Sequence, residues 1–146
     1  MLAPDLVTNP FPRVWAPPQS EMVKVNFDGS YVHELGRGGI GCVIRNSRGQ
    51  FLAACSHPVQ YAFHVETLAC LVGLQLASNQ GYRQVILEVK ELAQSFHHCS
   101  FQHVVRSGNT VADALAHDGL YATSHVRWFG TPPLFLVSSL AADNDL

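Results

Sequence analysis

The stretch that decides the fold is Val-Lys-Val-Asn-Phe-Asp-Gly-Ser at residues 23–30. Apolar and polar residues alternate along it, which is the pattern of a β-strand that buries one face. The strand is predicted to end at Asp28, because Gly29 interrupts the pattern. An aspartate in this position is suited to hold a metal ion or a phosphate, and an Asp-Gly pair is also typical of a turn that closes a hairpin. The rest of the sequence decides between the two.

Composition points to one globular domain. The chain has 146 residues, 47% of them hydrophobic and 14% charged, which is enough apolar material for a core. No apolar run is long enough to cross a membrane, and residues 1–5 do not resemble the start of a secretory signal. The four cysteines are scattered and form no Cys-x-x-Cys pair. We therefore expect an intracellular protein, in the nucleus or the cytoplasm, with reduced thiols and no disulfide partner.

The charge balance is slightly acidic. Nine lysines and arginines stand against eleven aspartates and glutamates, for a net charge of −2. A protein that binds nucleic acid without sequence preference usually carries a basic excess. Tight non-specific binding is therefore not expected, whereas local contact with nucleic acid is compatible with this balance.

Three segments are predicted along the chain: a proline-rich leader at 1–20, a folded domain at 21–125 and a proline-containing tail at 126–146. We expect Trp15 to anchor the leader to the domain. Within the domain, the patterns predict strands at 22–28, 42–46, 51–55, 85–87 and 101–105, and helices at 64–80, 90–97 and from 109 onward. The order indicates an α/β fold, in which a three-stranded meander is extended by parallel strands through helical crossovers.

One motif is rejected on its context. Residues 36–41 read Gly-Arg-Gly-Gly-Ile-Gly, which formally matches the G-x-G-x-x-G motif of dinucleotide-binding proteins. That motif requires a helix directly after it, and residues 42–46 are rich in strand-forming side chains. The glycines are therefore predicted to lead into the second strand.

Three acidic residues occupy comparable places. Asp28 is at the first strand, Glu66 in the first turn of the long helix, and Asp113 in the first turn of the last helix. An acid near a helix start commonly does no more than complement the helix dipole. As a set, however, they can meet at one end of the sheet, and clustered carboxylates suit Mg²⁺ or Mn²⁺. Two such ions about 4 Å apart promote hydrolysis of a phosphodiester.

Five segments in this order resemble the type 1 ribonuclease H fold, in particular the plant reverse-transcriptase-like domains related to the ribonuclease H of retroelements. The likeness extends over about residues 15–146, and its segments lie at 15–30, 38–45, 66–70, 101–106 and 109–116. It implies a ribonuclease H-like, five-stranded mixed sheet with strands one, four and five parallel and flanking helices.

The resemblance also implies a function. Domains of this kind bind RNA–DNA hybrids and cleave the RNA strand with Mg²⁺ or Mn²⁺. It places Asp28, Glu66 and Asp113 among the metal-binding catalytic carboxylates, and Arg106 and Asn109 near substrate phosphates. The alternatives from the residues alone are a surface cation for Arg106 and a helix N-cap for Asn109. A further predicted nucleic-acid contact is made by Gly29 and Ser30, whose N–H and hydroxyl groups can bind a phosphate or a 2′-hydroxyl.

The chain departs from the family at one position. The family carries a fourth carboxylate in a Glu-x-Asp context after the fourth strand, where this chain has Glu88-Val89-Lys90. The stretch between strands four and five is also shortened. Because the Lys90 ammonium would repel cations, we hypothesise that two-metal binding is weakened or lost. The alternative function is accordingly an inactive remnant that acts as a nucleic-acid-binding or protein-interaction module.

Overall fold

The computed structural model describes residues 15–60, 65–87, 98–101 and 108–144, with the backbone alone at 65–67, 87 and 98–101. One mixed sheet has the strand order β5-β4-β1-β2-β3-β6. Its strands are β1 (Val23–Val32), β2 (Arg37–Asn46), β3 (Phe51–Val59), β4 (Gln84–Leu87), β5 (His98–Phe101) and β6 (Val126–Phe129). The helices are α1 (Val65–Asn79), α2 (Thr110–Tyr121) and α3 (Val137–Asn144), with 3₁₀ turns η1 (His33–Leu35) and η3 (Leu134–Leu136).

The predicted fold class is confirmed. Strand β4 pairs with β1 and with β5 in parallel, whereas β2 and β3 pair antiparallel in the predicted meander. The structure adds β6 to the five predicted strands, antiparallel to β3 at the edge of the sheet. Its four residues, together with η3 and α3, come from the segment predicted as a tail.

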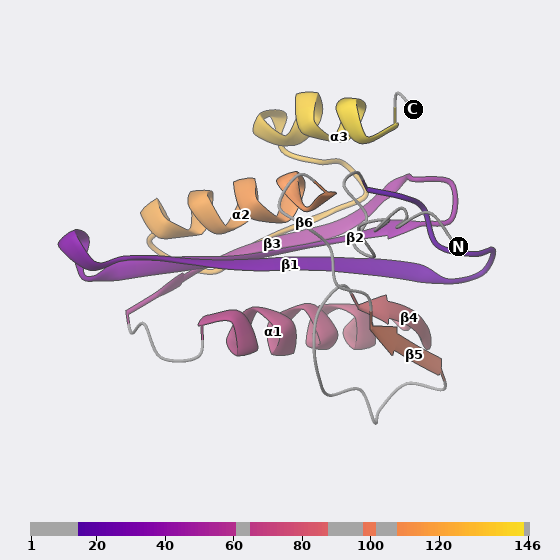
Figure 1. Cartoon of the computed structure of the whole chain (residues 1–146), viewed down its shortest axis with the longest axis horizontal. Coiled ribbons are helices and arrows are strands. Elements are labelled where there is room, and N and C mark those ends of the chain that lie inside the picture. The colour runs from indigo at the N-terminus through magenta and orange to yellow at the C-terminus, as the bar shows by residue number, and fades with distance from the viewer. Residues whose placement is uncertain (1–14, 61–64, 88–97, 102–107, 145–146) are drawn as a thin grey trace, which may run out of the picture.

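The domain has three layers. Figure 1 shows α1 on one face of the sheet and α2 and α3 on the other. Each face has its own apolar cluster. The first includes Val25, Phe27 and Leu74, and the second joins α2, η3 and α3 to the sheet through Val43, Leu115 and Leu140. Both faces of β2 are consequently buried along most of the strand, which is why its sequence lacks a polar face.

The extent of β1 corrects two predictions. Asp28 neither ends this strand nor forms a hairpin turn, because β1 continues to Val32 and stays paired with β2. The chain reverses instead through η1, which Gly36 follows in the left-handed conformation at φ 59°. The alternating pattern fails after Asp28 because β1 becomes partly exposed there, and not because the strand stops.

The glycine-rich segment enters β2, as predicted. The glycines have a second role that the sequence did not indicate. A Cβ atom at Gly41 would overlap Leu115 and Ala116 of α2, and one at Gly39 would overlap the same helix. Helix α2 therefore packs directly against the backbone of β2, an approach that glycine permits.

The other predicted bounds are close to those observed. Helix α1 ends at Asn79, and Gly81 follows it at φ 85°, in agreement with the predicted C-cap. Strand β5 begins at His98, earlier than the predicted start at 101. The predicted helix at 90–97 and the shortened stretch after β4 lie outside the described residues. Within the described part of the chain, no helix is long and apolar enough to cross a membrane.

Candidate active site

Asp28 lies in the central part of the sheet, on a strand that is flanked by β2 and β4. Among the described residues, the last registered pair between β1 and β4 is Val25 with Leu87, at the carboxyl end of β4 as described. Asp28 lies three residues beyond that pair and is partly buried. Its Oδ1 accepts a hydrogen bond of 2.9 Å from the backbone N–H of Gly29. Carboxyl ends of parallel strands are the usual location of binding sites in α/β sheets.

Asp113 lies in the first turn of α2, and a side chain of the residue before the helix joins that turn to β1. Asn109 Nδ2 donates to the carbonyl oxygen of Phe27 at 3.0 Å, and Asn109 Oδ1 accepts from Asn26 Nδ2 at 3.0 Å. The start of α2 is thereby held against the residue that precedes Asp28. Asn26 and Asp28 are two residues apart in a strand and so face the same layer, that of α2.

Asn109 does not perform the role that the sequence predicted. It occupies the N-cap position of α2, but among the described residues its side chain makes no capping hydrogen bond to the helix. Both polar groups of its amide are directed to β1 instead. The reason is that Asn26 is fully buried and its amide needs partners, which Asn109 supplies from across the layer.

One substitution, Asn109→Asp, distinguishes the capping role of this residue from its contact with β1. An aspartate is as good an N-cap as asparagine, but it cannot donate to the Phe27 carbonyl and would place an anion beside it. We expect Asn109→Asp to lower the free energy of unfolding by about 2 kcal/mol, since a buried acceptor loses its donor. Urea denaturation measures this. A stability equal to that of the parent chain would indicate a simple capping role.

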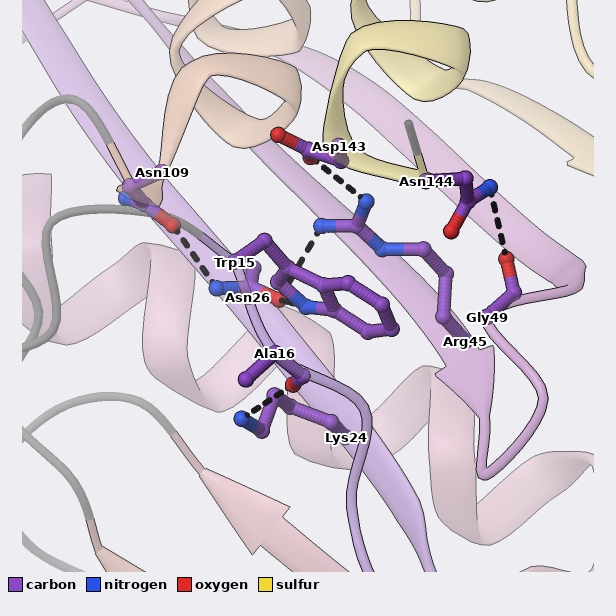
Figure 2. Close-up of polar contacts among 9 residues, drawn as sticks. All are labelled: Trp15, Ala16, Lys24, Asn26, Arg45, Gly49, Asn109, Asp143 and Asn144. Carbon is purple, nitrogen blue, oxygen red and sulfur yellow. Dashed lines mark hydrogen bonds and ion pairs between the residues drawn. The ribbon is translucent and has the colours of Figure 1, made fainter. Parts of the chain in front are cut away.

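A second group of polar contacts continues from Asn26, as Figure 2 shows. Trp15 Nε1 donates to Asn26 Oδ1 at 2.9 Å, and Arg45 Nη2 lies 3.4 Å from the same oxygen. The Arg45 guanidinium stacks on the Trp15 ring at 3.9 Å and forms an ion pair of 2.7 Å with Asp143 of α3. The predicted anchoring of the leader by Trp15 is thus confirmed.

The leader is also held by Lys24, which lies in β1 as Asn26 does. Lys24 is only 3% exposed, and its ammonium donates to the carbonyl oxygen of Ala16 at 2.7 Å. Sequence reasoning missed the roles of Lys24, Asn26 and Arg45. One signal in the sequence could have indicated these roles. Polar residues recur in β1 and β2, two strands that the pattern places at the centre of the sheet.

The structure describes the other predicted site residues only in part. Glu66 is in the first turn of α1, on the opposite face of the sheet from α2, and its side chain lies outside the described residues. Arg106 and Lys90 also lie outside them. Gly29 and Ser30 are in β1, and the Gly29 N–H donates to Asp28, so a phosphate would compete with that carboxylate for it. The meeting of the three carboxylates stays a prediction.

The donor chemistry fits a hard divalent cation. Asp28 and Asp113 are carboxylates on two elements that the Asn109 hydrogen bonds hold together, and oxygen ligands of this kind suit Mg²⁺ or Mn²⁺. Within the described part of the chain, no group of three or more histidine, cysteine, aspartate or glutamate side chains could hold a metal ion. Further donors would have to come from Glu66 or from residues 88–90.

Comparison with solved structures defines the class of fold. A ribonuclease H1 from Halobacterium salinarum NRC-1 superposes with a TM-score of 0.58 at 21% identity, covering 68% of this chain and 97% of that one. The N-terminal ribonuclease H domain of a Mycobacterium tuberculosis protein, solved as a fusion with maltose-binding protein, gives 0.59 at 21% identity, covering 68% and 98%. The fold is therefore that of a ribonuclease H-type domain.

The sequence profile of the reverse transcriptase-like family matches residues 26–91 and 86–119, more than half of the chain. The protein belongs to that family. No curated protein matches the sequence. The family match begins at Asn26 and so does not include Trp15, and it ends before Asp143. Arg45 therefore joins two segments that lie outside the matched residues to the sheet.

Proposed function

We propose that this domain binds RNA–DNA hybrids and cleaves the RNA strand with a divalent metal ion. Asp28, Glu66 and Asp113 would hold the ion, which would activate water and stabilise the leaving oxygen when bound. Asn109 is a positioning residue, since it acts on Asp28 and Asp113 through the backbone of β1 and the start of α2.

One observation carries the proposal. The hydrogen bond from Asn109 to the Phe27 carbonyl brings the first turn of α2, with Asp113, to the part of β1 that holds Asp28. This contact supports a shared site for the two residues, in a chain that belongs to the reverse transcriptase-like family and has a ribonuclease H-type fold.

The direct test is cleavage of a labelled RNA–DNA hybrid in Mg²⁺ or Mn²⁺. We expect Asp28→Asn to lower the rate by about a hundredfold or more, because metal activation contributes several kcal/mol to the transition state. Asp113→Asn should have a similar effect. Asp118→Asn is the matched control, since it removes the same charge from the same helix outside the proposed site. Equal activity of Asp28→Asn and the parent chain would contradict the proposal.

The second candidate is a binding module without catalysis. It is favoured by Lys90, which occupies the place of the family's fourth carboxylate. This module would shift a labelled hybrid in a salt-sensitive manner and leave it intact. Isothermal titration with Mg²⁺ or Mn²⁺ separates the candidates further, because two well-defined sites would exclude a lost metal centre.

One substitution tests the effect of Lys90, the residue at which this chain departs from the family. Lys90→Asp restores the Glu-x-Asp context at 88–90 and changes the local charge by two units in favour of cations. If the parent chain cleaves weakly because of this lysine, the variant should titrate more metal and cleave faster. Glu21→Gln, at an exposed position in the turn before β1, tests whether any change of an acidic side chain affects the assay.

A further inference from the structure

A second cluster of reactive groups lies on the opposite face of β2 from Asn109. Cys42 of β2 and Cys55 of β3 are directly opposed in the antiparallel register, and their Sγ atoms lie 2.7 Å apart. Both side chains are fully buried, and both are free thiols. The Cβ atoms of directly opposed residues are about 4.5–5.5 Å apart and those of a disulfide about 3.5–4.5 Å, so a bond between the two sulfurs requires the strands to approach by about 1 Å.

A small cavity lies beside one of the two cysteines, Cys55. It has a volume of about 50 Å³ and is lined by Cys55, by Gln75 and other side chains of α1, by His125 and by Arg127 of β6. Cys42 is not part of its wall. Arg127 is exposed, so the cavity lies at the surface. A cavity of about 10–15 Å³, measured in the same way, holds one water molecule, so this space has room for a molecule about the size of hydrogen peroxide.

The surroundings of Cys55 favour its thiolate. The hydrogen bond with Cys42 and the neighbouring His125 imidazole lower the pKa of Cys55 to about 6, against the opposing effect of burial. The contact with Cys55 and burial raise the pKa of Cys42. His125 packs edge-on against His57 at 4.6 Å, and its buried Nε2 has no hydrogen-bond partner among the described residues. The two thiols are therefore chemically unequal.

We propose that Cys42 and Cys55 form a peroxide-oxidised dithiol site, in which Cys55 reacts first and Cys42 resolves it. The Cys55 thiolate attacks one oxygen of hydrogen peroxide, the O–O bond breaks, and the departing hydroxide takes a proton to leave as water. Cys55 is then a sulfenic acid. The Cys42 sulfur attacks the Cys55 sulfur, the S–O bond breaks, and a second water leaves with the Cys42 proton. Two thiols and one peroxide become one disulfide and two waters.

The experiment uses the full reduced chain in native buffer. Hydrogen peroxide is added, remaining thiols are alkylated in denaturant, and intact mass and peptide maps are recorded. We expect the four alkylatable cysteines to fall to two, with a single Cys42–Cys55 linkage. This measurement needs no variant. Four alkylated cysteines after peroxide, or a linkage that involves Cys70 or Cys99, would overturn the proposal.

Variants test the order of the two steps. In Cys42→Ser, a sulfenic acid should persist at Cys55 and be trapped by a 1,3-diketone probe. In Cys55→Ser, oxidation of Cys42 should be about tenfold slower, because this thiol does not line the cavity and burial opposes its ionisation. Cys70→Ser should behave as the parent chain. Equal rates at the two positions would contradict the assigned order.

Discussion

Gly41→Ala is expected to lower the free energy of unfolding by about 3 kcal/mol or more, at the upper end of what overpacking costs. The added methyl group would overlap the backbone nitrogen of Ala116 and the Cβ of Leu115 in α2. A backbone cannot rotate away as a side chain can, so the helix must move off the sheet. Because α2 carries Asp113, the variant should also lose any activity that depends on that residue.

Urea denaturation, followed by tryptophan fluorescence and circular dichroism, measures the change. Gly81→Ala is the control, because a Cβ at Gly81 meets open space although the residue has φ 85°. We expect that control to cost about 1–2 kcal/mol, the penalty for a side chain in the left-handed region. A Gly41→Ala variant that is no less stable than Gly81→Ala would show that α2 does not pack on β2 as closely as the structure indicates.

Arg45→Met should destabilise the domain by about 3–5 kcal/mol, the usual result when one partner of a buried ion pair is removed. Arg45 is fully buried, and the Asp143 side chain that it contacts at 2.7 Å is only 7% exposed. Methionine preserves much of the volume but leaves the Asp143 carboxylate without this cation. It also removes the stacking on Trp15, so both flanking segments lose their contact with the Arg45 guanidinium.

Two further variants identify the cause of that loss. Arg48→Met changes an exposed arginine in the β2–β3 turn and should alter stability by less than about 0.5 kcal/mol. Arg45→Met combined with Asp143→Leu should recover part of the loss, since no buried charge is then left uncompensated. If the double variant is no more stable than Arg45→Met, the stacking on Trp15 and not the ion pair is the main contribution of Arg45.

The sequence predicted the elements well where local patterns suffice. Alternation located β1, the turn residues at 46–49 located the β2–β3 hairpin, and helical spacing with a terminal glycine located α1 to within a residue at each end. These signals depend on neighbours along the chain, which are visible in the sequence. The pattern was misleading at Asp28 because a strand that turns from buried to partly exposed loses its alternation without ending.

The candidate site was predicted as a set of residues but not as a set of contacts. The sequence singled out Asp28, Asp113 and Asn109, and the structure places all three at the junction of β1 and α2. It did not reveal that Asn109 bonds to β1 and not to its own helix. A local rule assigns an asparagine at a helix start to capping, whereas the actual partners are 82 and 83 residues away.

What the sequence alone determined is the order of the described strands and long helices from β1 to α2, the α/β class and the chemical character of three carboxylates. Only the tertiary structure decided which buried polar groups meet: Arg45 with Asp143 across 98 residues, Asn26 with both Trp15 and Asn109, and Cys42 with Cys55. The physical reason is that a buried hydrogen-bonding or charged group must find a partner within about 3 Å. That partner is chosen by the packing of the layers and not by distance along the chain.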